Sequence, residues 1–300
     1  MPEHAPRNTS SLKQFLVFTK FRLSFLVVLS AISGYLFAGG TDLIEITLLT
    51  IGGSFVTAAS NGANQIWEKD IDKLMKRTAN RPLPQGQMRL NFAYISVIVL
   101  LIIGSYLLFI INIQCALIGL AAFISYVFMY TPMKAKSSWA VFIGAFPGAV
   151  PPLLGAIAAT NSFGFLPGVL FFVQFTWQFP HFWAIAWVSH DDYQKAGYHL
   201  LPSSLGRSKQ SAFQILIYSV ALIPFSLIPW LLDWTGTITF VVASLLGTMF
   251  FLYAYKLFLT QEDSDARKLM FASFVYLPII QFTYVLDKAE NIKILSDGFI

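Results

Sequence analysis

The chain has 300 residues, of which 56% are hydrophobic and only 12% are charged. A soluble domain carries about 25% charged residues, so this chain has too little polar surface to cover a globule in water, and the lipid bilayer is its expected solvent. The formal net charge is +5, and the single cysteine, Cys115, excludes an intrachain disulfide and fits no spacing for a metal or haem attachment site.

The first twenty residues are polar and contain no short apolar stretch followed by a small-residue cleavage site. This composition argues against a cleaved signal peptide. We therefore expect residues 1–20 to form an N-terminal tail and the first apolar run to be retained as a membrane span.

Nine apolar runs follow in chain order. They cover residues 22–40, 43–63, 91–111, 113–130, 139–160, 163–188, 211–232, 236–258 and 269–287. A membrane-spanning helix needs roughly 20 apolar residues, and runs of this length without two-residue alternation indicate helices rather than strands. The predicted fold is all-α, a polytopic bundle of nine transmembrane helices.

The connectors between the runs alternate in charge. Those after the first, third, fifth and seventh runs contain no lysine or arginine, whereas the N-terminal tail and the other connectors, with the run edges, hold all of the 20 basic residues except Lys288 and Lys293. Because basic loops stay in the cytoplasm, we expect a cytoplasmic N-terminus, one transmembrane domain over residues 21–288 and an external C-terminal tail over 289–300. The basic excess follows from this asymmetry and does not indicate nucleic-acid binding.

The connector after the second run begins with acidic residues. In "NQIWEKDIDKLMKRTANRPLP", Asn64, Glu68 and Asp72 are four residues apart, so they share one face if the helix continues to about Met75, as we expect. Carboxylates at this spacing repel one another on a helix. A Mg²⁺ ion, which prefers carboxylate and phosphate oxygens, would offset that repulsion.

Basic residues follow at once in the same connector. They are Lys69, Lys73, Lys76, Arg77 and Arg81. Pro82 disfavours helix before it, so Arg77 and Arg81 are expected on a loop, where arginine can bind phosphate oxygens in a bidentate manner. Acids for a metal beside bases for phosphate indicate a diphosphate site. The alternative is a solvated helix with local ion pairs, such as Asp70 with Lys73 or Asp72 with Lys76.

The sixth run leads into a second long polar connector, "SHDDYQKAGYHLLPSSLGRSK". In the predicted topology it lies on the same side as the first connector, so the two could face one another across a cavity; a plain polar loop is the alternative. His181 follows Pro180 inside the sixth run, and a histidine at membrane depth is a functional candidate by default. The alternative for His181 is a packing residue, hydrogen-bonded to a carbonyl that Pro180 leaves free.

The first connector resembles a signature of the UbiA-type intramembrane prenyltransferase superfamily, N-x-x-x-D-x-x-x-D followed by R-T-x-x-R-P-L. Glu68 stands in place of the middle aspartate, and this variant resembles the haem O synthases, or protohaem IX farnesyltransferases, of that superfamily. The second connector is similar to theirs in P-H-F-W, D-D-Y, A-G and L-P. Most of the superfamily carries a second D-x-x-x-D, which is absent here because Trp187 and Lys195 stand four residues either side of Asp191. The resemblance covers about residues 15 to 285.

The resemblance implies transfer of the farnesyl group of farnesyl diphosphate to a vinyl group of haem B, giving haem O, with Mg²⁺ as cofactor. A segment similar to the family's Y-T…L-K-R adds Tyr130 and Lys134, although Ala135 stands where many members have arginine and Lys136 would supply that charge. The implied residues are Asn64, Glu68 and Asp72 for the metal, Arg77, Arg81 and Lys134 for the diphosphate, and Tyr130 and His181 for substrate contact.

Several implied roles stay open. Asp191 and Asp192 would bind one ion through water or orient Lys195 toward phosphate, and His181 would be an axial haem ligand or a propionate contact. The resemblance and the lack of a transit peptide favour the plasma (inner) membrane of a bacterium, with the site loops on the cytoplasmic side. Contact with a haem A synthase or a terminal oxidase assembly is a further expectation.

Two other functions remain as alternatives. One is prenyl transfer to an aromatic acid or quinone precursor, against which Glu68 and the missing second D-x-x-x-D argue. The other is a secondary transporter with Asp and His proton relays, whose acids should lie near the bilayer midplane. In this chain the acids cluster at one predicted interface.

Overall fold

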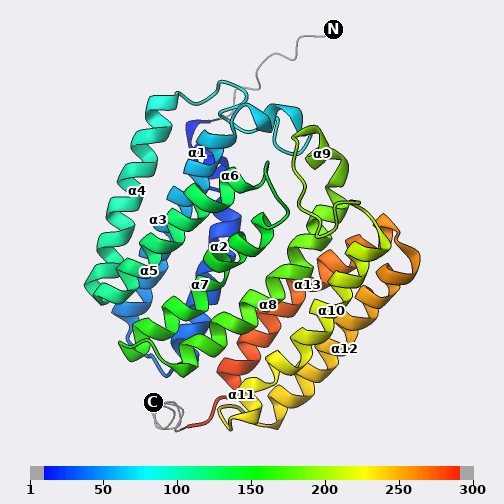
Figure 1. Ribbon diagram of the computed structural model, residues 1–300. Helices are drawn as coiled ribbons and strands as arrows, with labels where there is room; N and C mark the ends of the chain where they lie inside the picture. The colour runs from blue at the N-terminus through cyan, green and yellow to red at the C-terminus, as the bar shows by residue number, and fades with distance from the viewer. Residues whose placement is uncertain (1–9, 291–300) are drawn as a thin grey trace.

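The computed structural model describes residues 10–290, and this part of the chain is helical, with no strand beyond an isolated bridge between Thr235 and Lys288 (Figure 1). The all-α prediction is confirmed. The elements are α1 (Ser11–Phe18), α2 (Phe21–Phe37), α3 (Leu43–Glu68), η1 (Ile71–Leu74), α4 (Leu90–Ile111), α5 (Ile113–Ile124), η2 (Ser125–Tyr130), α6 (Thr131–Met133), α7 (Ala140–Thr160), α8 (Phe165–Val188), α9 (His190–Lys195), α10 (Lys209–Ser226), α11 (Ile228–Leu231), α12 (Thr237–Thr260) and α13 (Asp263–Leu286).

Seven helical segments in the described residues are long and apolar enough to cross a membrane, as expected for a multi-pass membrane protein. They are Leu43–Glu68, Leu90–Ile111, Ile113–Met133, Ala140–Thr160, Lys209–Leu231, Thr237–Thr260 and Asp263–Leu286. Helix α2 has only 17 residues, and α8 carries Gln174, Gln178 and His181, polar groups that lower its mean hydropathy. The count of nine spans and the side of the N-terminus therefore stay predictions.

The described residues include the second half of the first expected tail, from residue 10, and the first two residues of the second. Within the first, residues 11–18 form helix α1, and the described part of the second ends at residue 290. The boundaries of the single domain, 21–288, remain a prediction.

Side-chain caps explain where several of the long helices begin. The Asp42 carboxylate accepts hydrogen bonds from the backbone N–H groups of Ile44 (2.6 Å) and Glu45 (3.3 Å) at the start of α3. Asn112 caps α5 and Ser208 caps α10 in the same manner. These bonds satisfy N–H groups that have no partner within the helix.

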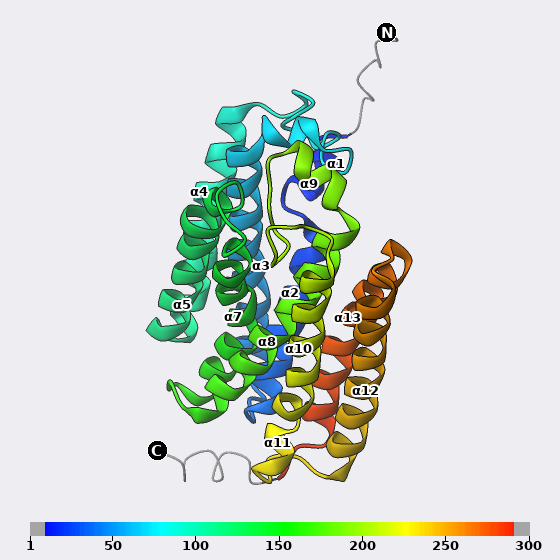
Figure 2. The same cartoon turned by 45° about the vertical axis from the view of Figure 1, so that its right-hand side comes forward.

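The long helices pack as a closed bundle. Helix α3 packs against α4 and α2, α2 against α7, α7 against α8, and α8 against α10 and α13. Contacts between α13 and α2 close the circle, and the two views show α2, α7 and α8 near its centre (Figures 1 and 2). Buried apolar side chains form one cluster around α2 to α5 and another around α8, α10, α12 and α13, and α7 contributes to both.

Small residues bring α2 and α7 into close contact. A side chain at Gly34 would collide with the backbone of Pro152, and one at Gly155 would collide with the carbonyl oxygen of Ala31. Without Cβ atoms at these positions the two backbones touch, which is how membrane helices commonly associate. This contact fixes one wall of the cavity described below.

The first polar connector departs from the sequence prediction. Helix α3 ends at Glu68 rather than continuing to about Met75, and a 3₁₀ turn over Ile71–Leu74 follows. Thr78 Oγ1 donates to the Asp72 carbonyl oxygen (2.9 Å), which folds the chain back on itself. As predicted, Arg77 and Arg81 lie in the non-helical segment before α4. This connector and α9 lie at the same end of the bundle (Figures 1 and 2).

A π-helical turn interrupts the fourth apolar run at Ser125–Tyr130. Such turns are rare and often occur at functional sites, because they rotate side chains relative to the rest of the helix. Here the turn contains Tyr126 and Tyr130, and both rings line the cavity.

Candidate active site

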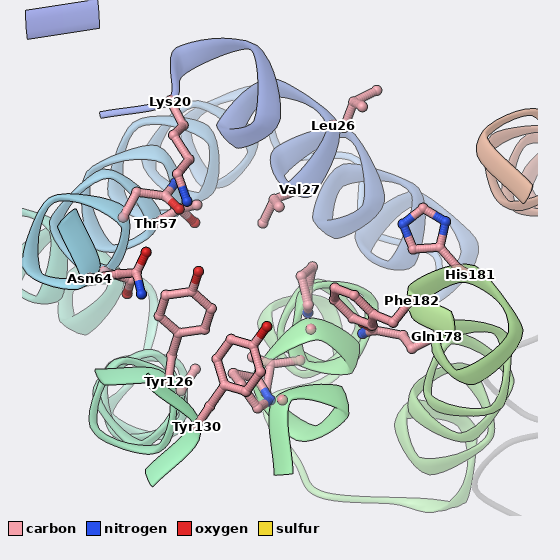
Figure 3. Close-up of a pocket in the computed structure, with 18 of the residues that line it drawn as sticks. Lys20, Leu26, Val27, Thr57, Asn64, Tyr126, Tyr130, Gln178, His181 and Phe182 are labelled. Carbon is pink, nitrogen blue, oxygen red and sulfur yellow. The ribbon is translucent and has the colours of Figure 1, made fainter. Parts of the chain in front are cut away.

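A cavity of about 470 Å³ opens among α2, α3, η2, α7, α8 and α13 (Figure 3). Most of its wall is formed by apolar and uncharged polar side chains. The charged residues that line it are Lys20, Glu68, Asp72, Arg77, Arg81 and Lys134. All of them come from the end of the bundle that carries the polar connectors, so the cavity has one charged end and a long apolar body.

The three predicted metal-binding residues meet at the charged end. Asn64, Glu68 and Asp72 are 1%, 3% and 0% exposed. They do not share one helical face, because α3 ends at Glu68 and Asp72 lies in the 3₁₀ turn. Asn64 Nδ2 donates to Thr131 Oγ1 (3.1 Å), which ties α3 to the start of α6.

Each buried carboxylate has one cationic partner. Lys134 Nζ lies 2.8 Å from Glu68 Oε1, and Arg81 Nη1 lies 2.6 Å from Asp72 Oδ2. Burial raises the pKa of Asp72 above its usual value, although the Arg81 guanidinium opposes this. Burial alone would lower the pKa of Lys134, but the Glu68 carboxylate outweighs it and holds that pKa above the usual range. Lys134 is therefore a cation at neutral pH.

The charged end suits a divalent cation. Asp72 lines the cavity, and its buried Oδ1 has no hydrogen-bond partner, so this carboxyl oxygen is not committed to another group of the protein. Residues 10–290 contain no group of three or more His, Cys, Asp or Glu side chains that could hold a metal by themselves. The donor set therefore fits Mg²⁺, which keeps waters and shares substrate phosphate oxygens with one or two carboxylates.

The two polar connectors, which we expected to face one another across a cavity, are in direct contact. The Arg77 backbone N–H donates to Asp192 Oδ2 (3.3 Å), and Arg77 Nη2 donates to the Tyr193 hydroxyl (3.2 Å). The guanidinium also lies over the Tyr193 ring, 5.7 Å from its centroid. These contacts position Arg77 at the rim of the cavity.

The acids of the second connector lie elsewhere than expected. Asp191, Asp192 and Lys195 do not line the cavity. The Asp191 side chain is 75% exposed and pairs with Arg207 Nη1 (3.2 Å), while Asp192 lies 3.7 Å from Lys195 Nζ. Asp192 thus contacts the Arg77 connector and pairs with Lys195, and a role for these residues at a metal or a phosphate stays a prediction.

His181 lines the cavity and is 7% exposed. Its Nδ1 lies 2.7 Å from Ser273 Oγ on α13, so the observed partner is a hydroxyl on another helix rather than a carbonyl freed by Pro180. Figure 3 shows His181 across the cavity from Asn64 and Lys20. The candidate residues therefore divide between a charged side and an uncharged side.

The model of the UbiA prenyltransferase family matches residues 27–276. The chain belongs to this family. The protoheme IX farnesyltransferase of Cytophaga hutchinsonii is 45% identical over 282 residues, covering 93% of this chain and 99% of that protein.

Two solved structures share the UbiA fold. A structure described as digeranylgeranylglyceryl phosphate synthase has a TM-score of 0.77 at 21% identity, covering 92% of this chain and 98% of its own. A UbiA homolog from Archaeoglobus fulgidus bound to GPP and Mg²⁺ has a TM-score of 0.64 at 14% identity, covering 91% and 99%. At these identities the likeness establishes the fold.

In this UbiA family member the structure adds site residues that the sequence analysis did not single out. Lys20 lies between α1 and α2 with a left-handed backbone (φ 50°) and lines the cavity. Its only sequence signal is its place, with Arg22, at the start of the first apolar run. Tyr126 and Tyr198 also line the cavity, and the Lys134 ammonium lies 5.9 Å from the Tyr198 ring centroid.

Lys20 predicts a pH dependence for anion binding. Burial, with Arg81 and Lys134 nearby, lowers the pKa of Lys20 from 10.5 to about 7. Folding therefore disfavours the charged form, and the free protein should gain stability as pH rises from about 7 toward 10.5. A bound anion favours the charged form, so the affinity for inorganic diphosphate should fall by up to about tenfold per pH unit above that pKa.

Calorimetric titration with inorganic diphosphate between about pH 6 and pH 9, the range around the shifted pKa, measures this dependence. In Lys20→Met the affinity for diphosphate should fall less steeply with rising pH, because the titrating ammonium is gone. The titration of diphosphate itself affects both proteins equally. Equal slopes for the two proteins would contradict the prediction.

Proposed function

We propose that this protein transfers the farnesyl group of farnesyl diphosphate to a vinyl group of haem B, giving haem O. The observation that carries the proposal is the pairing of buried acids and bases at one end of a long apolar cavity, which suits an amphipathic diphosphate. The choice of acceptor rests on the relative named protoheme IX farnesyltransferase, at 45% identity over nearly its whole length.

The charged end would bind and activate the diphosphate. Asn64, Glu68 and Asp72 would hold Mg²⁺, which supplies electrostatic stabilisation of the leaving group when bound. Arg81, Lys134 and the rim residue Arg77 present guanidinium and ammonium groups to the same space. These cations lower the barrier because negative charge grows on the diphosphate as the allylic C–O bond breaks.

The apolar body would protect and direct the allylic cation. The cavity lies inside the bundle, away from bulk water, and the rings of Tyr126 and Tyr130 line it. Aromatic faces stabilise cations within about 6 Å of the ring centroid. The allylic carbon bonds to the terminal vinyl carbon, a water oxygen bonds to the carbon next to the porphyrin, and diphosphate and one proton leave.

The membrane setting is part of the proposal. Both substrates are amphipathic and would enter from the bilayer with their charged ends at the polar connectors. We place these connectors and the N-terminus on the cytoplasmic side of a bacterial plasma membrane, because the basic residues cluster there. Contact with a haem A synthase or a terminal oxidase assembly remains a prediction.

Mass spectrometry of extracted haem tests the proposal. Membranes containing the protein are incubated with haem B, farnesyl diphosphate and Mg²⁺, with and without a chelator. The expected product is haem B with one farnesyl group and one hydroxyl group added across a vinyl group, and chelation should abolish it. Prenylation of an added aromatic acid with no haem product would overturn the assignment of haem B as the acceptor. No transfer to either compound would favour the transporter alternative.

A further inference from the structure

The hydrogen bond between His181 and Ser273 determines which ring nitrogen carries the proton. Ser273 Oγ lies 2.7 Å from His181 Nδ1 and 2.6 Å from the carbonyl oxygen of Met270. A carbonyl only accepts, so the single hydroxyl proton of Ser273 is donated to Met270. The bond to His181 must then run from Nδ1–H to Oγ. His181 therefore carries a proton on Nδ1, and in the neutral imidazole Nε2 has a free lone pair.

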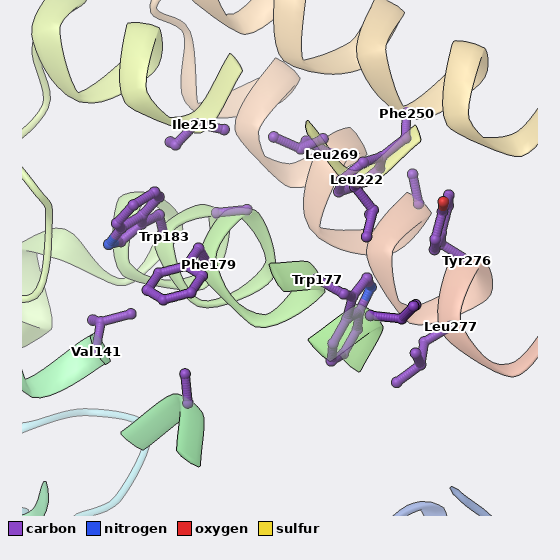
Figure 4. Packing of buried hydrophobic residues seen from close by; sticks show 14 of the residues in the cluster. Val141, Trp177, Phe179, Trp183, Ile215, Leu222, Phe250, Leu269, Tyr276 and Leu277 are labelled. Atoms are coloured by element: carbon purple, nitrogen blue, oxygen red, sulfur yellow. The ribbon is translucent and has the colours of Figure 1, made fainter. Parts of the chain in front are cut away.

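The surrounding rings hold the imidazole in one orientation. Trp177, one turn earlier on α8, stacks on His181 with centroids 4.3 Å apart and planes at 17°. Trp177 Nε1 donates to the Ser273 carbonyl oxygen (3.1 Å), so Ser273 binds both residues. The Phe274 ring meets His181 edge-on at 4.9 Å. Trp177 belongs to the buried cluster joining α8 to α13 (Figure 4), so the ring has a rigid support.

The position of His181 leaves its Nε2 available to a molecule in the cavity. The residue lines the cavity, and its hydrogen bond within the described residues uses Nδ1 rather than Nε2. The six charged residues that line the cavity come from the end with the polar connectors, and Figure 3 shows the imidazole across from Lys20 and Asn64. In neutral His181, the unprotonated Nε2 is therefore on the uncharged side of the cavity, where the acceptor would bind.

We propose that His181 Nε2 is an axial ligand of the haem iron and that Ser273 is the residue that positions it. This rests on the proposed function, because it requires haem as the acceptor. A histidine that ligates a metal typically donates its other N–H to an oxygen, which fixes the tautomer and makes the ligating nitrogen more basic. Ser273 supplies that oxygen, and neutral imidazole is a common ligand of haem iron.

The same geometry argues against the propionate role. A carboxylate needs a hydrogen-bond donor, but the only N–H of this tautomer is already engaged by Ser273. Iron ligation instead anchors the macrocycle by its centre. The propionates and vinyl groups are then oriented by the cavity wall, and one vinyl group is held at a fixed distance from the diphosphate end.

Haem binding without farnesyl diphosphate tests the proposal directly. Haem B is titrated into the purified full-length protein in detergent, and the optical and resonance Raman spectra of the ferrous complex are recorded. Wild type should show a histidine-ligated spectrum with an iron–nitrogen stretching band. His181→Ala should lose that band and regain a ligated spectrum with added imidazole. His199→Ala, which removes an exposed loop histidine, is the matched control and should match wild type.

Ser273→Ala separates positioning from ligation. It should shift the iron–nitrogen band to lower frequency and weaken haem binding by about tenfold or more, because the imidazole loses its acceptor. Ser273→Thr keeps a hydroxyl and should restore the wild-type band. An unchanged band in Ser273→Ala would overturn the role of Ser273.

The outcomes also separate this inference from the proposed function. A wild-type complex without a histidine band, or one that His181→Ala leaves unchanged, would overturn iron ligation while haem O production continued to support farnesyl transfer. No haem binding by wild type, together with no haem product in the mass spectrum, would overturn both.

Discussion

Asp72→Asn should lower turnover by at least about 100-fold, the scale of losing one stabilising group for a developing anion, while the protein still folds and inserts. The substitution keeps the shape of the side chain but removes the charge of Oδ1, the buried oxygen without a hydrogen-bond partner. The free protein should lose some stability, because Arg81 Nη1 loses its charged partner at 2.6 Å, so folding is checked by thermal unfolding in detergent. Haem product formation and the concentration of Mg²⁺ for half-maximal activity measure the effect.

Asp70→Asn is the matched control for this prediction. Asp70 lies two residues away, is exposed and pairs only with Lys69 and Lys73. Its loss should change turnover less than about twofold, because exposed ion pairs contribute little. Near-normal activity of Asp72→Asn, at an unchanged Mg²⁺ requirement, would show that Asp72 does not bind the metal.

Lys134→Met should both destabilise the protein and impair turnover. The Lys134 and Glu68 side chains are 10% and 4% exposed and lie 2.8 Å apart. Removing one partner leaves a buried charge without compensation, which typically costs about 3–5 kcal/mol. Turnover should also fall, because the ammonium faces the space assigned to the diphosphate. Thermal unfolding in detergent and haem product formation measure the two effects.

The double variant Glu68→Gln/Lys134→Met distinguishes folding from catalysis. It removes both buried charges, so most of the lost stability should return while turnover stays low. Lys73→Met, which removes an exposed lysine paired with Asp70, should leave both quantities near wild type. A single variant Lys134→Met that unfolds at the wild-type temperature would show that the pair is not a buried, coupled one.

The sequence by itself determined the membrane character and the location of the charged end of the cavity. Apolar runs and basic connectors are local properties, since a span depends on its own hydropathy and on the charge of its flanks. The spacing of Asn64, Glu68 and Asp72 was also visible locally. So was the break before Pro82 that leaves Arg77 and Arg81 outside a helix.

The partners of these residues could not be predicted from local spacing. The pair of Asp70 with Lys73 is present at 2.8 Å, as helical spacing suggests. Asp72 instead pairs with Arg81, nine residues away, because the chain turns at Glu68 and folds back. Glu68 pairs with Lys134, 66 residues away. Such pairs exist only where packed helices bring distant termini to one end of a bundle.

The tertiary structure alone decided how the two sides of the cavity are made. It placed Lys20 in the lining of the cavity, Asp191 and Asp192 outside that lining, and His181 against Ser273, 92 residues further along the chain. In lipid, a buried polar group must find a partner within the protein. Which partner it finds depends on how the helices pack, and that information is spread over the whole chain rather than held in any one motif.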